Sequence, residues 1–120
     1  MAKGKLTVYH YPQCGTCRKA IKWLKDRGWE LDLHHIVEEQ PSAQQLKTWI
    51  PQSGTPIQKW FNTSGEVYRQ SGMKDKLASM TDEEKIAALA GNGKLLKRPI
   101  VTDGHKVTVG FKEDEFENQW

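Results

Sequence analysis

The sequence predicts an α/β protein with a four-stranded mixed sheet, interrupted by a group of short helices. Residues 5–37 have a strand–helix–strand order, and residues 99–120 have a strand–strand–helix order. Between them, residues of about 41–95 carry only short helical patterns. A strand–helix–strand crossover favours parallel pairing, whereas a tight turn joins antiparallel strands. The expected sheet therefore contains both kinds of pairing.

The N-terminal strands and helix follow from local patterns. Residues 5–10, Lys-Leu-Thr-Val-Tyr-His, are rich in residues that favour strands. Over residues 14–27, apolar side chains recur at helical spacing, and Gly28 is a typical helix stop. Residues 29–37 alternate in character and predict the second strand.

The middle of the chain predicts several short helices. Ser42 is a suitable N-cap for a helix that Pro51 and Ser53-Gly54 are expected to end. Residues 73–79 predict one or two helical turns. The sequence Thr-Asp-Glu-Glu at residues 81–84 is a capping box, which predicts a helix to about Ala90.

The C-terminal part returns to strands. Residues 99–102 and 106–109 flank Asp103-Gly104, a typical hairpin turn, and residues 113–120 predict a closing helix. A chain of 120 residues has the size of one domain. We therefore expect a single domain over residues 1–120, with a helical insertion over about 41–95.

Composition limits the possible functions. The net charge is +3 and no long basic run occurs, so direct binding to nucleic acid is not expected. No stretch approaches the roughly 20 apolar residues of a membrane span, and the N-terminus has no apolar run of signal-peptide length. We therefore expect a cytoplasmic protein. A close cysteine pair in a reducing compartment suggests redox chemistry or metal binding.

The cysteine pair lies where the first strand leads into the first helix. The sequence there is Cys14-Gly15-Thr16-Cys17. Unsatisfied N–H groups and the positive end of the helix dipole favour a thiolate at this position. Cys17 lies one helical turn further on, where it could attack a mixed disulfide formed on Cys14. The arrangement predicts a redox-active pair.

Alternative interpretations of these residues stay open. Two spaced cysteines commonly supply half a zinc site, and two buried thiols could also be chemically inert. His10 either polarises the Cys14 thiol or is a packed polar residue at the end of a strand. No second cysteine pair exists, and the four histidines, which are His10, His34, His35 and His105, lack the usual ligand spacing. We therefore expect no metal and no cofactor.

Arg98 and Pro99 form a second candidate element of the site. Proline is compatible with the first residue of a strand, because its missing donor is not needed there. A guanidinium at residue 98 can stabilise a thiolate or bind an oxyanion through two parallel hydrogen bonds. The alternative is a surface arginine before an ordinary trans proline.

Three segments together resemble the ArsC/Spx family, which joins glutaredoxin-coupled arsenate reductases with Spx-type regulators. These segments are Tyr9 to Lys19, Leu96 to Ile100 and Val109 to Glu115. The resemblance covers nearly the whole chain. It implies a thioredoxin-like fold, in which Cys14 corresponds to the reactive cysteine of the reductases. It also implies that Pro99 is a structural cis-proline facing that cysteine, beside Arg98.

The resemblance implies two functions. The first is a thiol-dependent reductase that uses Cys14, Cys17 and Arg98, with glutaredoxin, thioredoxin or a low-molecular-weight thiol as reductant. The second is a redox-sensing regulator that binds the C-terminal domain of the RNA polymerase α subunit. Two further arginines of the arsenate reductases correspond to Asn62 and Gly110 here, which carry no positive charge. Arsenate is therefore not the expected substrate.

Overall fold

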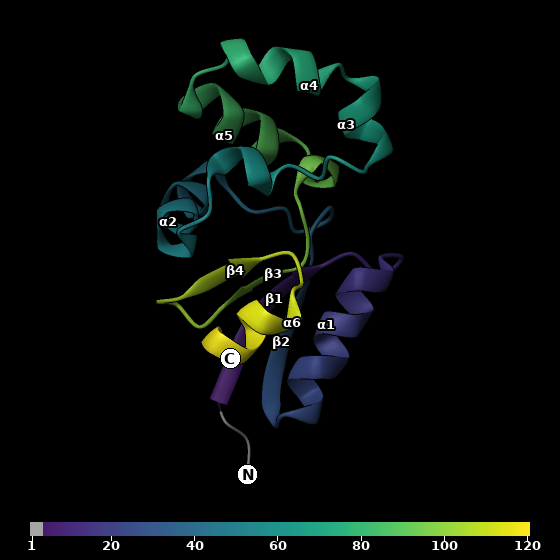
Figure 1. Cartoon of the computed structure of the whole chain (residues 1–120), viewed down its shortest axis with the longest axis vertical. Helices are drawn as coiled ribbons and strands as arrows, with labels where there is room; N and C mark the ends of the chain where they lie inside the picture. The colour runs from purple at the N-terminus through teal and green to yellow at the C-terminus, as the bar shows by residue number, and fades with distance from the viewer. Residues whose placement is uncertain (1–3) are drawn as a thin grey trace. The chain divides into compact units, whose positions relative to one another are not determined.

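The computed structural model describes residues 4–120, which fall into two compact units (Figure 1). We call the first the sheet unit; it comprises Met1–His35 and Arg98–Trp120. We call the second the helical unit; it comprises Ile36–Lys97. The helical unit is slightly wider than the insertion expected over residues 41–95. Whether the chain behaves as a single domain stays a prediction.

The sheet unit confirms the predicted four-stranded mixed sheet. Its elements are β1 (Gly4–His10), α1 (Gly15–Asp26), β2 (Trp29–His35), β3 (Ile100–Thr102), β4 (Val107–Val109) and α6 (Glu113–Gln119). The strand order is β2-β1-β3-β4. β1 pairs in parallel with β2, as the crossover through α1 predicts. The β1–β3 and β3–β4 pairs are antiparallel.

An apolar cluster joins α1 and α6 to the sheet. Its buried members are Leu6, Val8, Ala20, Trp23, Leu24, Val101, Phe116 and Trp120. The Trp23 and Phe116 rings meet edge to face, with centroids 5.4 Å apart. Full burial of one such large apolar side chain stabilises a fold by about 1.5–3 kcal/mol. This cluster fixes α1 on the sheet, and with it the cysteine pair at the helix start.

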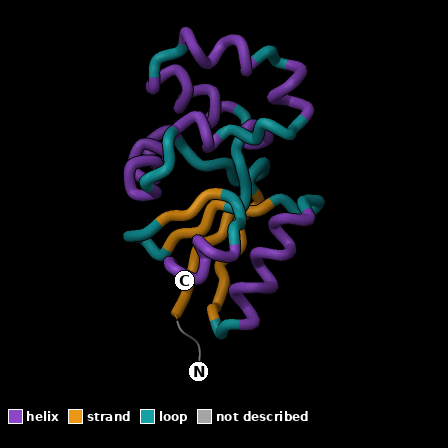
Figure 2. Tube along the Cα trace, viewed as in Figure 1, coloured by secondary structure: helices purple, strands orange, loops and turns teal. Residues whose placement is uncertain are grey.

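The helical unit consists of short helices joined by loops (Figure 2). Its elements are α2 (Ala43–Ser53), η1 (Ile57–Trp60), α3 (Glu66–Gln70), α4 (Met73–Lys76), η2 (Leu77–Ser79), α5 (Asp82–Gly91) and η3 (Gly93–Leu95). The structure confirms the predicted N-cap Ser42 of α2 and the predicted capping box at Thr81 of α5, and it shows that Ser42 also forms a capping box, with Gln45. Trp49 and Trp60 are buried here, in accord with their apolar neighbours in the sequence.

Of the two stops that the sequence predicts for α2, Ser53-Gly54 is confirmed and Pro51 is not. α2 continues through Pro51 to Ser53. A proline in the last turn removes one backbone donor, which a helix end tolerates better than a helix interior does. The Ser53 hydroxyl donates to the Ile50 carbonyl at 2.7 Å, and the helix ends at Gly54, whose φ is 66°. The left-handed conformation of this glycine, not the proline, stops the helix.

Two smaller findings concern boundaries and membranes. The second strand ends at His35, two residues before its predicted end at residue 37. Within residues 4–120, no helix has the length and apolar character needed to cross a bilayer.

Candidate functional site

Cys14 is the N-cap residue of α1. Its backbone is extended, with φ −90° and ψ 116°, and its Sγ accepts a hydrogen bond from the Cys17 backbone N–H at 3.3 Å. The Cys14 N–H donates to the Tyr11 carbonyl at 2.9 Å, which fixes the loop before the helix. The sulfur therefore occupies the place of a capping oxygen, where the backbone donors of the first turn favour negative charge.

The surroundings of Cys14 favour its thiolate. Partial burial by itself would raise the pKa of Cys14. Hydrogen bonds from the thiol and the backbone of Cys17, together with the hydrogen bond and charge of Arg98, outweigh burial and lower that pKa below its usual range. Cys14 is also partly exposed, so a reagent can reach its sulfur.

Cys17 has the opposite character. Its side chain lies in the core and is 0% exposed. Burial raises the pKa of Cys17 to about 12, and the neighbouring Cys14 also raises it. A hydrogen bond from the Tyr11 backbone and the charge of Arg98 lower this pKa, but they do not outweigh burial. Both cysteines are free thiols in this structure. The pair thus combines an exposed, acidic thiol with a buried, protonated one.

Arg98 comes from the other end of the chain to the same place. The Arg98–Pro99 peptide is cis, and the Pro99 carbonyl accepts from the Gly110 N–H at 2.9 Å. The guanidinium carbon of Arg98 lies 4.8 Å from the centroid of the Tyr11 ring. Its Nη1 atom is buried and has no hydrogen-bond partner within residues 4–120. The fold therefore brings Cys14, Cys17 and Arg98 together, with one arginine donor still available.

Comparison with known proteins identifies the family and supports the fold. The model of the ArsC family matches residues 9–119. The chain belongs to the ArsC family. A crystal structure of an ArsC family related protein from Bacteroides fragilis is similar to the chain, with a TM-score of 0.91 and 49% identity. The match covers 94% of this chain and 95% of the other, so the thioredoxin-like α/β fold is shared over the full length.

Several ArsC-family relatives differ in what their names say. The chain is 53% identical over 115 residues to the uncharacterized protein YusI of Bacillus subtilis, covering 96% of this chain and 98% of the other. It is 31% identical to the regulatory protein MgsR of the same organism, and the match covers 92% of this chain and 86% of MgsR. It is 29% identical to the global transcriptional regulator Spx of Enterococcus faecalis, and the match covers 92% of this chain and 82% of that protein. It is also 29% identical to an arsenate reductase of Acidiphilium multivorum, and that match covers 80% of this chain and 67% of the reductase.

His10 and His35 end the two parallel strands of the sheet unit, and the His35 ring contacts Tyr11. His10 of β1 is paired in register with His35 of β2. Burial first, and then the charge of His35, lower the pKa of His10, so its neutral form is favoured. His34 Nε2 lies 3.1 Å from the Asp32 carboxylate. Among residues 4–120, no group of three or more His, Cys, Asp or Glu side chains is arranged to hold a metal ion.

Tyr11 is the residue that sequence reasoning missed. The sequence indicated only a loop there, but the ring lies against Arg98 on one side and meets the His35 ring edge to face, with centroids 5.5 Å apart. Its hydroxyl donates to the Gln13 side chain at 3.3 Å. One sequence signal could have indicated Tyr11: it is an aromatic residue in the short loop that leads into the candidate reactive cysteine.

Proposed function

We propose that this ArsC-family protein is a thiol–disulfide oxidoreductase in which Cys14 is the nucleophile and Cys17 the resolving thiol. The observation that carries the proposal is the pairing of a partly exposed Cys14, whose pKa is lowered at a helix N-terminus, with the Arg98 guanidinium. A thiolate is the reactive form of cysteine, and both features favour it. The burial of Cys17 supports assigning the two roles in this order.

The chemistry is a two-electron exchange. The Cys14 thiolate attacks one sulfur of a disulfide substrate, a Cys14–substrate disulfide forms, and the other substrate sulfur leaves as a thiolate. Cys17 then gives up its proton to solvent and attacks Cys14 Sγ, which releases the second substrate thiol and leaves a Cys14–Cys17 disulfide. Once Cys14 is in a disulfide, it no longer adds to the pKa rise of Cys17, so resolution becomes easier.

The reductant that restores the dithiol belongs to the same proposal. We assign this role to glutaredoxin, thioredoxin or a low-molecular-weight thiol, and we place the protein in the cytoplasm, where such reductants act. Arsenate is not the substrate we propose, since Asn62 and Gly110 stand where the resemblance puts two further arginines. Lys59 and Arg69 are the alternative sources of that charge.

The test is the thiolate content of Cys14 as a function of pH, measured by absorbance near 240 nm in the reduced Cys17→Ser variant. We expect the pKa of Cys14 to lie below the unperturbed value of about 8.5. Arg98→Ala should raise this pKa, and Arg98→Lys should raise it by less, because a neighbouring opposite charge favours the ionised form. An unperturbed pKa that Arg98→Ala leaves unchanged would remove the proposed nucleophile.

A second candidate function is a redox-sensing regulator that binds the C-terminal domain of the RNA polymerase α subunit. It is supported by the cysteine pair together with the similarity to proteins named MgsR and Spx. Capture of purified α subunit by the oxidised protein but not by the reduced one, or the reverse, would favour this role. Turnover of a disulfide substrate with a reductant, and no capture in either state, would favour the enzyme.

A further inference from the structure

The solvent side of α1 presents a row of cations that begins beside Cys14. We call Arg18, Lys19, Lys22 and Lys25 the basic face; all four are exposed. The opposite side of the helix is buried in the sheet unit. The one acidic residue of α1, Asp26, lies 2.8 Å from Lys22 and offsets part of its charge. The face keeps a clear positive excess.

The basic face reaches from the reactive sulfur to the far end of the helix. The Arg18 guanidinium lies back over the first turn, since its Nη2 is 4.0 Å from the position that a Cβ on Gly15 would take. At 1.5 Å per residue, Lys25 lies roughly 16 Å along the helix axis from Cys14. This is the length of a short peptide segment, and it lies next to the thiol.

Helix stability accounts for only part of this charge pattern: Lys25 in the last turn suits the negative end of the helix dipole, and Lys22 pairs with Asp26. A cation over the first turn faces the positive end of the helix dipole, which is unfavourable. Arg18 and Lys22 are four residues apart, and Lys22 and Lys25 are three apart, so like charges are neighbours. Both arrangements destabilise an isolated helix.

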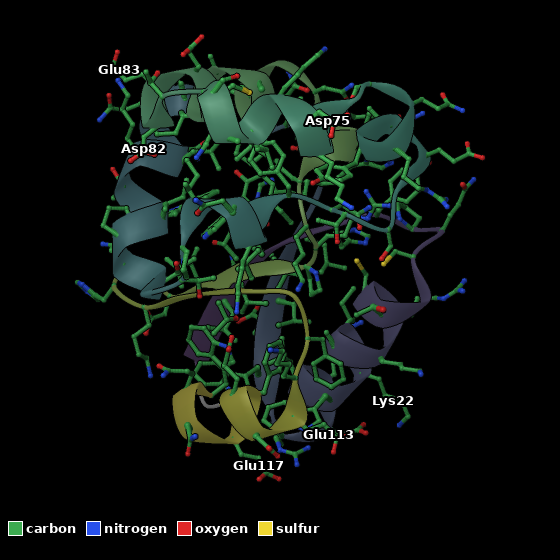
Figure 3. The ribbon with its side chains drawn as sticks, turned by 45° about the horizontal axis from the view of Figure 1, so that its top comes forward. Lys22, Asp75, Asp82, Glu83, Glu113 and Glu117 are labelled. Carbon is green, nitrogen blue, oxygen red and sulfur yellow. The ribbon has the colours of Figure 1, made fainter. Side chains whose placement is uncertain are left out.

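Four of the eight acidic residues of the sheet unit lie on a different helix. α6 begins with Glu113, Asp114 and Glu115, where acidic groups suit the helix dipole, and it also carries Glu117. In Figure 3, Lys22 projects from α1, whereas Glu113 and Glu117 project from α6. On α1 the four cations face only one acidic residue, Asp26, at the end of the helix away from Cys14, so the local excess of positive charge begins beside Cys14.

We propose that the basic face is a docking surface for an acidic protein segment that flanks the cysteine of a thiol or disulfide partner. This inference rests on the proposed function and adds the charge of the partner to it. Opposite charge near a reactive group accelerates encounter and fixes orientation, more than it adds affinity. The partner is thus recognised by acidic residues around its reactive sulfur.

The test uses three synthetic peptides, each with one cysteine in a mixed disulfide with 5-thio-2-nitrobenzoate. Four Glu, four Gln or four Lys residues flank the cysteine. The protein is the reduced Cys17→Ser variant, so the reaction stops after one step. The Cys14 thiolate attacks the peptide sulfur, the Cys14–peptide disulfide forms, and the coloured nitrothiobenzoate thiolate leaves, which is measured at 412 nm.

At low ionic strength we expect the Glu peptide to react about tenfold faster than the Gln peptide, and the Lys peptide to be slowest. Near 1 M salt the three rates should converge. In Lys22→Gln/Lys25→Gln the ratio of the Glu to the Gln rate should fall toward one. The matched control, Lys5→Gln/Lys112→Gln, changes the net charge equally on exposed residues outside α1 and should keep the ratio of the unchanged protein.

Equal rates for the Glu and Gln peptides at low salt would overturn the docking proposal. So would a control variant that loses the ratio as fully as the α1 variant, because net charge alone would then explain the effect. Failure of the proposed function would look different: the rates of all three peptides would rise with pH as those of an unperturbed thiol of pKa about 8.5 do, and Arg98→Ala would leave that pH dependence unchanged.

Discussion

At the scale of single residues, Cys14 and Cys17 are the same residue type on one helix, yet their surroundings separate them. Cys14 receives donors from the first turn and from Arg98, which favour its thiolate. Cys17 faces the core, where burial favours the thiol. The sequence predicted the pair and its place at a strand–helix junction, because both are local. The contact between Arg98 and Tyr11 joins distant parts of the chain, so no local pattern could predict it.

The Tyr11 ring gives a prediction at this scale. Tyr11→Leu should raise the pKa of Cys14, because the ring that lies against the Arg98 guanidinium is lost and the charge is held less firmly near the sulfur. Tyr11→Phe keeps the ring and should behave like the unchanged protein. Thiolate absorbance against pH measures both. A Tyr11→Leu curve that overlays the Tyr11→Phe curve would show that the ring does not position Arg98.

At the scale of elements, patterns that repeat over a whole segment gave reliable predictions. The order β1–α1–β2, the hairpin, the Ser42 N-cap and the Thr81 capping box follow from periodicity and cap residues. Boundaries were less predictable: of the two stops predicted for α2, the helix passes Pro51 and ends at Ser53-Gly54, where the glycine adopts a left-handed backbone. The packing of the short helices in the helical unit depends on contacts distant in sequence, which single-sequence patterns do not contain.

Gly93 in the helical unit offers an element-scale prediction. A Cβ at this position would collide with the Ile36 carbonyl, whereas a Cβ on Gly91 would meet nothing within 4 Å. Gly93→Ala should therefore lower the free energy of unfolding by about 1–3 kcal/mol through overpacking. Gly91→Ala, at the end of α5, should leave it unchanged or raise it by up to about 1 kcal/mol. Urea unfolding followed by tryptophan fluorescence measures both; equal values for the two variants would contradict the predicted collision.

At the scale of the whole molecule, the two cysteine pKa shifts give the reduced protein a pH-dependent stability. The folded pKa of Cys17 is about 12, above the unfolded value of about 8.5. Above about pH 8.5 the unfolded chain loses this proton while the native protein keeps it, so the free energy of unfolding falls, by at most about 1.4 kcal/mol per pH unit. The lowered pKa of Cys14 has the opposite effect. The Cys14 thiolate stabilises the folded protein fully above the pKa of the unfolded chain, and this stabilisation is lost as the pH falls through the pKa of Cys14 in the folded protein.

Urea unfolding between pH 6 and pH 10, with a phosphine reductant present, separates these contributions. Cys17→Ala should remove part of the decline in the free energy of unfolding above about pH 8.5. Cys14→Ser should remove part of the increase in the free energy of unfolding with pH below about pH 8.5. Profiles for both variants that run parallel to that of the unchanged protein would assign the pH dependence to other titrating groups.

The burial of Cys17 within α1 has a consequence for how the molecule can be observed. A thiol reagent reaches Cys14 directly, but it reaches Cys17 only when the first turns of the helix open. The labelling rate of Cys17, in a Cys14→Ser background, therefore reports the free energy of that local opening. The labelling rate of Cys17 therefore measures how often the N-terminal turn of α1, next to residue 14, unfolds locally.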